Sequence, residues 1–184
     1  MPISIGTDPT KAFTDLGRLE REIRSMIRRN GGDLRPSASS VSKGKRNSVR
    51  YTGALREKVA SVVEITTTDI ARAIGFYSPK WSSWLRSNFE HAQGAKPPLS
   101  TLLSPAVKKR GQYASQVEPI INGVKLDGTK PQYIYNTVDY AAAVARGDFP
   151  GISASLDWYL DIEQRHAGGR YVRDAVVSVA GGKK

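Results

Sequence analysis

The segment from Pro9 to Asn30 constrains the fold most, because its pattern is typical of a long amphipathic helix. Asp8 can cap its first turn, and Pro9 suits the first helical position, where no amide donor is needed. The glycines that follow Asn30 end the pattern. Apolar residues recur along the segment at helical spacing, namely Phe13, Leu16, Leu19, Ile23, Met26 and Ile27.

The next third of the chain mixes two kinds of pattern. Residues Thr52 to Ile65 begin with helical spacing, but the run from Val62 to Thr68 is rich in β-branched side chains, which favour strands. We therefore expect a short helical turn that leads into a strand. Ala71 to Tyr77 is the expected antiparallel partner of that strand.

Further elements are predicted in the second half. Trp81 to Gln93 has helical spacing, and Val117 to Tyr135 has the best strand pattern, with Asn-Gly and Asp-Gly turn pairs inside it. Tyr140 to Arg146 and Ser155 to His166 are predicted helices, whereas Tyr171 to Val179 fits a helix or a strand. Together these elements indicate a single α+β domain over residues 1–184.

Two segments are predicted to be mobile arms rather than parts of the core. Residues 34–50 and 95–116 are polar and contain prolines or glycines, and the tail 180–184 should fray. The two arms also concentrate positive charge, at Lys43, Lys45, Arg46, Arg50, Lys108, Lys109 and Arg110.

The composition indicates what such arms would contact. The net charge is +11 and the pI about 10.0, which favours polyanions or acidic protein surfaces as partners. Bases stack on aromatic side chains that alternate with basic ones, and neither arm has that alternation. Three interpretations stay open, namely solvated loops, docking on an acidic protein surface, and contact with the DNA backbone alone.

The sequence contains no recognisable motif for a catalytic site or a cofactor site. The chain has no cysteine and two histidines, His91 and His166, which we place at the C-terminal ends of helices rather than in a metal site. Asp157 and Asp161 share a helix face, and a hydrolase would need two carboxylates held at a fixed separation. The other interpretations, a solvated acidic surface or a contact for a basic neighbour, are favoured. No nucleophile motif or phosphate-binding glycine loop occurs. We therefore expect neither enzymatic activity nor a cofactor.

The sequence also bears on localisation and on packing. The first residues lack the pattern of a signal peptide, and no apolar run has the roughly 20 residues that span a bilayer. Trp81, Trp84 and Trp158 fit two roles, as anchors of the core or as anchors of an interface.

Two short motifs carry a resemblance to a known family. The first is Thr52-Gly53-Ala54-Leu55-Arg56, which follows the long helix and the basic segment. The second begins with Tyr133-Ile134-Tyr135-Asn136 and continues with Tyr140-Ala141 and then Gly147. In this order the motifs resemble those of neck or tail-completion proteins of tailed bacteriophages.

The resemblance implies both a fold and a role. It implies a long N-terminal helix packed on a small antiparallel or mixed sheet with additional helices. It also implies a structural virion protein of the neck that joins the portal or adaptor to the tail terminator or tail tube as part of a ring. Such a protein resides in the virion and, during assembly, in the host cytoplasm, with no membrane partner.

The motif residues have physical roles that fit a structural protein. Gly53 would allow a tight turn, Leu55 would enter the core and Arg56 would stay outside. Asn136 can cap the turn after its strand. Tyr140 and Ala141 would start a helix that packs on the sheet, and Gly147 would end it.

The sequence also departs from the family pattern. Ala145 stands where an acidic residue is common, and the stretch from Asp148 to Gly168 is longer than usual. Arg170 and Arg173 would belong to a delayed equivalent of the closing segment. The resemblance covers about a third of the chain. The alternative function is that of a basic nucleic-acid-binding protein that contacts the DNA backbone without base specificity.

Overall fold

The chain is described here from a computed structural model, which defines residues 3–33, 38–78, 85, 88–97, 121, 124–136, 138, 140–146 and 158–181. Within these ranges helices combine with one three-stranded antiparallel sheet, so the predicted α+β class is confirmed. The elements in chain order are β1 (Ile3–Thr7), α1 (Thr10–Asp33), α2 (Ala38–Tyr77), β2 (Phe89–Gln93), β3 (Gln132–Asn136), α5 (Ala141–Arg146), α6 (Trp158–Ala167) and α7 (Arg170–Ala180).

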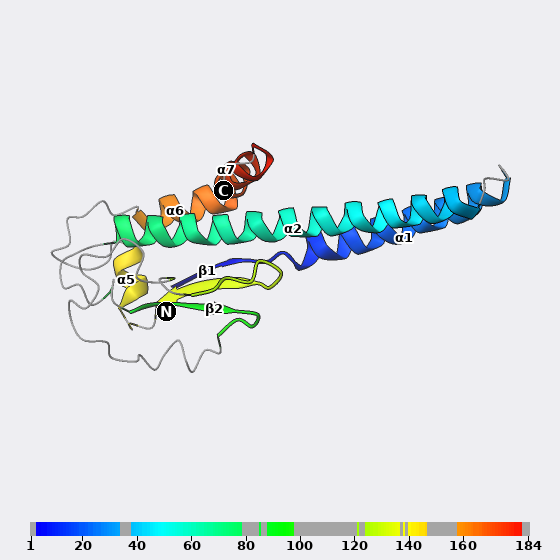
Figure 1. Cartoon of the computed structure of the whole chain (residues 1–184). Coiled ribbons are helices and arrows are strands. Elements are labelled where there is room, and N and C mark those ends of the chain that lie inside the picture. The colour runs from blue at the N-terminus through cyan, green and yellow to red at the C-terminus, as the bar shows by residue number, and fades with distance from the viewer. Residues whose placement is uncertain are drawn as a thin grey trace.

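The dominant feature is a helical hairpin that projects from the rest of the molecule. Helices α1 and α2 have 24 and 40 residues, so at 1.5 Å per residue α2 is about 60 Å long. They run side by side, and their joined ends extend beyond the sheet (Figure 1). Asp8 caps the start of α1, because its carboxylate accepts a 2.8 Å bond from the amide of Thr10.

The sheet has the strand order β1-β3-β2, with β3 antiparallel to both neighbours. Ile5, Ile134 and His91 stand opposite one another across the three strands, so their side chains share one face. Ile5 and Ile134 on this face are buried in the core. Strand β1 is only five residues long and was not predicted.

Helix α6 is fastened to the edge of the sheet by two side chains. The Tyr159 hydroxyl donates to the carbonyl of Ser4 at 3.4 Å, and His166 Nε2 lies 2.9 Å from the carbonyl of Gly6. Both carbonyls belong to β1, which is an edge strand. Side chains of α6 therefore occupy the carbonyls of Ser4 and Gly6 at this edge of the sheet.

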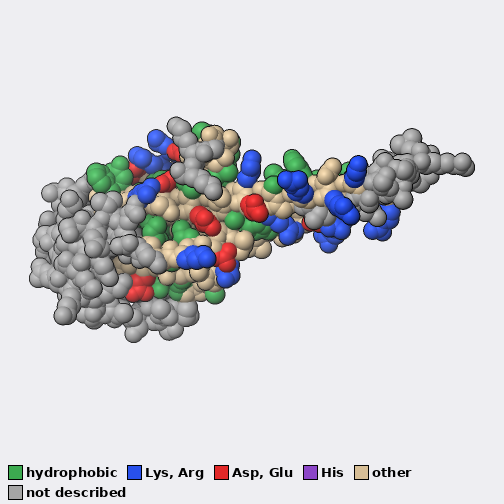
Figure 2. Space-filling model, viewed as in Figure 1, with side chains coloured by type: hydrophobic (Ala, Val, Ile, Leu, Met, Phe, Trp, Pro, Cys, Tyr) green, Lys and Arg blue, Asp and Glu red, His purple; other side chains and the backbone are tan. Residues whose placement is uncertain are grey.

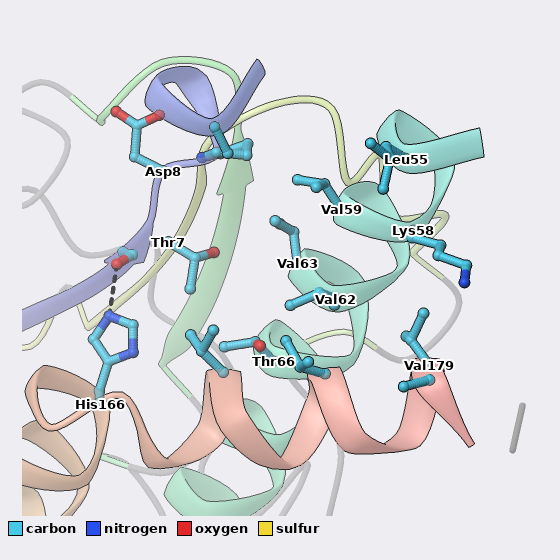
Figure 3. A pocket seen from close by; sticks show the side chains of 16 residues that line it. Thr7, Asp8, Leu55, Lys58, Val59, Val62, Val63, Thr66, His166 and Val179 are labelled. Carbon is cyan, nitrogen blue, oxygen red and sulfur yellow. Dashed lines mark hydrogen bonds between the residues drawn. The ribbon is translucent and has the colours of Figure 1, made fainter. Parts of the chain in front are cut away.

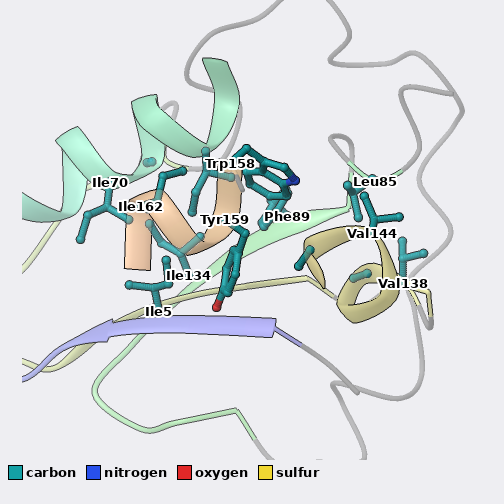
Figure 4. Packing of buried hydrophobic residues seen from close by; sticks show 14 of the residues in the cluster. Ile5, Ile70, Leu85, Phe89, Ile134, Val138, Val144, Trp158, Tyr159 and Ile162 are labelled. Carbon is teal, nitrogen blue, oxygen red and sulfur yellow. The ribbon is translucent and has the colours of Figure 1, made fainter. Parts of the chain in front are cut away.

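The core lies between α2, α6 and the sheet (Figure 4). Ile70 and Ile74 of α2 meet Ile162 of α6, and all three are at most 1% exposed. Trp158 packs edge-on against Phe89 of β2, with ring centroids 6.3 Å apart. Trp158 is therefore a core anchor, whereas Trp81 and Trp84 lie outside the described residues.

The structure corrects the predictions for residues 38–77, whereas residues 34–37 lie outside the described residues. A basic loop was expected at 34–50, and strands were expected at Val62–Thr68 and Ala71–Tyr77, but one helix runs from Ala38 to Tyr77. Lysine and arginine are good helix formers, which allows the polar first part to continue the helix. In the second part, side chains buried at helical spacing override β-propensity, namely Val63, Thr66, Thr67, Ile70, Ala71 and Ile74.

The outcomes in the second half differ between segments. The helix predicted over Trp81–Gln93 is wrong for Phe89–Gln93, which pair with β3 as a strand. Helices α5 and α6 confirm the predictions for Tyr140–Arg146 and for the described part of Ser155–His166, which begins at Trp158. Helix α7 settles Tyr171–Val179 as helix. The proposed arm at 95–116 lies almost entirely outside the described residues, as does most of the tail 180–184.

The Asp127-Gly128 pair makes a turn whose main role is contact with α2. The turn closes through a 3.0 Å bond from the Lys130 amide to the Asp127 carbonyl. The amide of Gly128 donates to Glu64 at 3.2 Å, and a Cβ placed on Gly128 would overlap the carbonyl of Ala60. Glycine is therefore required because two backbones touch. No helix in the described ranges is long and apolar enough to cross a membrane.

Two glycines in or beside α2 should respond to alanine in opposite directions. Gly128→Ala forces Cβ into the backbone of α2 and should lower the free energy of unfolding by about 1–3 kcal/mol. Gly53→Ala is the matched control, because Gly53 lies inside α2 with no other atom within 4 Å of an added Cβ. It should raise the free energy by about 0.5–1 kcal/mol. Urea unfolding of both variants measures this, and equal changes would contradict the contact with Ala60.

Candidate functional site

An open apolar groove of about 580 Å³ lies between α2, α7 and the junction of β1 with α1 (Figure 3). Its size is in the range of ligand and peptide sites. Only Asp8, Lys58, His166 and two threonines interrupt its apolar wall. The aliphatic lining comes chiefly from two helices, as Leu55, Val59, Val62, Val63, Val172, Val176 and Val179.

Helical spacing explains why these side chains meet in one groove. In α2 each lining position from Leu55 to Thr66 has another three or four residues away, so they form one stripe. In α7 the same holds from Val172 to Val179. Val172 is 40% and Val176 47% exposed, although α7 packs against α2 through Ala175. The groove thus presents apolar surface that no described residue covers.

One end of the groove holds two buried polar atoms without a hydrogen-bond partner among the described residues. Thr66 is 1% exposed, yet its hydroxyl is unpaired. His166 uses Nε2 to donate to Gly6, which in the neutral ring leaves a lone pair on the buried Nδ1, also unpaired. Buried polar atoms are normally satisfied, so this end is suited to a hydrogen-bonding group.

A second surface is defined by charge. Helix α1 and residues 38–58 of α2 contain twelve Lys and Arg against five Asp and Glu, so this hairpin holds seven of the eleven net positive charges. Figure 2 shows Lys and Arg side chains spread along the projecting part. The prediction of a mobile basic loop is wrong for residues 38–50, because they belong to helix α2.

Among the described side chains, the ion pairs of the hairpin involve residues 18–24 of α1 and Arg56 of α2, and none lies nearer the tip. Glu20 contacts Arg24 at 2.6 Å and Arg56 at 3.7 Å, which links the two helices. Beyond this level, exposed basic side chains have no ion-pair partner among the described residues. We call them the distal basic surface, made up of Arg28, Arg29, Lys43, Arg46 and Arg50.

The residues of the first motif lie together in the middle of α2. Thr52 is buried, Leu55 lines the groove rather than the core, and Arg56 pairs with Glu20 as an exposed residue. The turn predicted at Gly53 is wrong, because Gly53 is a helical residue of α2. Lys45 also lies in α2, but its side chain is outside the described part.

The residues of the second motif organise the end of β3. Asn136 is fully buried, and its side-chain amide donates to the carbonyl of Leu85 at 2.7 Å. Its side-chain oxygen accepts from the Val138 amide at 2.9 Å, which is the predicted turn cap. Ala141 is fully buried at the start of α5, and Tyr140 packs against the core. These roles are structural.

The remaining candidate residues fall in different places. Arg170 and Arg173 are exposed on α7, whereas Gly147 and Lys108, Lys109 and Arg110 lie outside the described residues. Asp161 pairs with Arg165 at 2.7 Å, and Asp157 is also outside the described part. In the ranges that the structure defines, no three His, Asp or Glu side chains are grouped as metal ligands would be.

The second histidine has a structural environment. His91 Nε2 lies 2.8 Å from the side-chain oxygen of Gln132, on the buried face of the sheet. Burial lowers the pKa of His91, and the bond to Gln132 opposes this only in part. The ring is therefore held neutral as part of the packing between β2 and β3. The predicted position at a helix end is wrong, because His91 belongs to β2.

Sequence reasoning did not find the groove, although a signal was present. The repeat of valine at 172, 176 and 179 matches helical spacing, and the exposed valines mark an amphipathic helix with an open face. The opposite wall comes from α2, where Val62, Val63 and Thr66 were interpreted as a strand. Comparison with protein-family models, with curated protein sequences and with solved structures finds no match for the chain.

Two adjacent threonines of α2 allow a test of the unpaired hydroxyl. Thr66→Val removes a buried hydroxyl without a partner and should raise the free energy of unfolding by about 1 kcal/mol. Thr67→Val removes a hydroxyl that donates to the Val63 carbonyl at 2.8 Å and lies 3.3 Å from that of Thr7. It should lower the free energy by about 1 kcal/mol. Urea denaturation compares the two, and a destabilising Thr66→Val would mean that its hydroxyl is satisfied.

Proposed function

We propose that this chain is a structural component of the neck of a tailed bacteriophage, where it joins the portal or adaptor to the tail as a member of a ring. The observation that carries the proposal is the helical hairpin, which extends beyond the body with apolar and basic side chains exposed on it (Figure 1). An arm of this kind has few partners within its own chain. Its contacts are therefore expected from neighbouring subunits.

The arrangement of the two surfaces supports a ring. The groove lies at the base of the hairpin and the basic surface lies toward its tip, so the surfaces differ in place and in chemistry. Rings form when one patch of a subunit binds a different patch of the next subunit and the rotation closes. The order of the motifs from Thr52 to Arg56 and from Tyr133 to Gly147 supports the phage neck in particular.

The proposal predicts where the chain is found and what its loss does. Virions of the phage or prophage that encodes it should contain the chain in several copies per particle, as measured by quantitative mass spectrometry. Disruption of its gene should leave filled heads and separate tails, because the joint between them is missing. A plasmid copy of the gene should restore joined particles. Infectious particles of normal composition without this chain would rule the proposal out.

A second candidate function is binding of the nucleic-acid backbone, and the distal basic surface favours it. Its exposed side chains carry no ion-pair partner among the described residues, and phosphates attract such groups without regard to base sequence. Tyr51 is the one large aromatic side chain among residues 38–58 of α2, so stacking on bases is not favoured.

Charge neutralisation separates this function from the first. Replacing Lys43, Arg46 and Arg50 by Gln should weaken binding to a 30-base-pair duplex and reduce the slope of log affinity against log salt by about three. Replacing Arg170 and Arg173 by Gln is the control, because both are exposed on α7, away from the hairpin tip. Fluorescence anisotropy at several salt concentrations gives the slopes. Absence of binding by the wild type at low salt would exclude this function.

A further inference from the structure

We propose that the groove between α2 and α7 receives the exposed face of α1 from a second copy of the chain. This inference rests on the proposed function as a ring component, because it names the contact that would join successive subunits. It requires a matching face on α1, complementary charge around it, and access to it in a neighbour. Each of these is found in the structure.

Helix α1 has an apolar face that α2 leaves open. Leu19 is 39% and Met26 49% exposed, and their spacing of seven residues places them on one side of the helix. Asp15 and Glu22 share that side, since they stand four and three residues from Leu19. Arg29, three residues from Met26, lies on the same side toward the tip. The part of the face around Leu19 is therefore a row of apolar and acidic side chains on a predominantly basic hairpin.

The groove has the shape and chemistry to hold such a face. Its walls are two helices with aliphatic side chains at helical spacing, which is the arrangement that binds an amphipathic helix through residues seven apart. Val176 of α7 is 47% exposed and lines the groove, so it offers apolar surface to an incoming Leu19 or Met26.

Charges around the two surfaces are complementary. Asp8 is the one acidic residue in the described lining of the groove, and its carboxylate accepts from the Thr10 amide at the start of α1. Lys58 also lines the groove, and Arg173 is exposed on α7 three residues from Val176. These cations are suited to Asp15 and Glu22 on the incoming helix. Glu22 pairs at 3.0 Å with Arg18, but both side chains are more than half exposed. Exposed pairs contribute little, so Glu22 can exchange this partner at small cost.

The helix that can occupy the groove is α1 of a second copy and not the chain's own α1. Only the first turn of α1, at Ala12, lines the chain's own groove, and the helix then leads away along the hairpin (Figure 1). The face and the groove are different patches, so the contact is heterologous and can be repeated from copy to copy. The net charge of +11 opposes association, which keeps the free protein mostly monomeric.

Cysteine cross-linking tests this contact, because the chain has no cysteine of its own. A Leu19→Cys copy is mixed with a Val176→Cys copy and oxidised, and disulfide-linked heterodimers are measured on non-reducing gels. The control pair replaces Val176→Cys by Val177→Cys, which is 69% exposed on α7 but does not line the groove. A second control replaces Leu19→Cys by Arg21→Cys, on the opposite side of α1.

We expect about tenfold more heterodimer from the Leu19→Cys and Val176→Cys pair than from either control, a difference of about 1.4 kcal/mol in contact preference. Met26→Asp added to the Leu19→Cys copy should remove the excess without changing the urea midpoint, because Met26 is half exposed. Equal yields in all pairs, or a Leu19→Cys homodimer that dominates the mixture, would overturn the inference.

The cross-linking result and the composition of virions together distinguish the inference from the proposed function. A specific heterodimer together with absence of the chain from virions would retain the contact and remove the neck function. Presence in virions without the specific cross-link, either in solution or within particles, would retain the neck function and overturn the contact.

Discussion

Burial of one side of α2 is the interaction on which the rest of the structure depends. From Val63 to Ile74 this side is buried, with α6 and the strands packed around it, and its earlier part supports α1 and α7. A hydrophobic side chain that becomes fully buried contributes about 1.5–3 kcal/mol. Ile70 and Ile74 are at most 1% exposed, so the strands and α6 depend on their position. The hairpin and the groove are both consequences, because α2 is longer than the sheet it covers.

Helices were predictable from the sequence where the apolar spacing was regular and the local composition did not favour another structure. The segment from Pro9 to Asn30 has a cap and a regular apolar stripe, and α1 lies over it. The stop predicted at the two glycines after Asn30 is wrong, because α1 continues through both to Asp33. Tyr140–Arg146 and Ser155–His166 are similar cases. The turn role of Asn136 was also predictable, since it follows from how a side-chain amide reaches a nearby backbone.

The predictions were wrong where burial in the folded protein decided which of two local structures forms. Val62 to Thr68 favours a strand by composition, but burial every three or four residues makes it helix. Residues 38–50 lack an apolar stripe, so nothing in their own pattern indicates that a partner helix exists. Gly128 was correctly linked to a turn, but its contact with the backbone of Ala60 lies 68 residues away and leaves no local signal.

The two bonds between α6 and β1 have a consequence for how this protein can assemble. The carbonyls of Ser4 and Gly6 face the outer edge of the sheet and accept from Tyr159 and His166. A strand from another molecule would have to displace both side chains before it could pair with β1, and edge strands are the usual sites of such pairing. Extension of the sheet through β1 is thereby blocked. A partner on this side must then be recognised by side chains on helix surfaces and not by main-chain hydrogen bonds to β1.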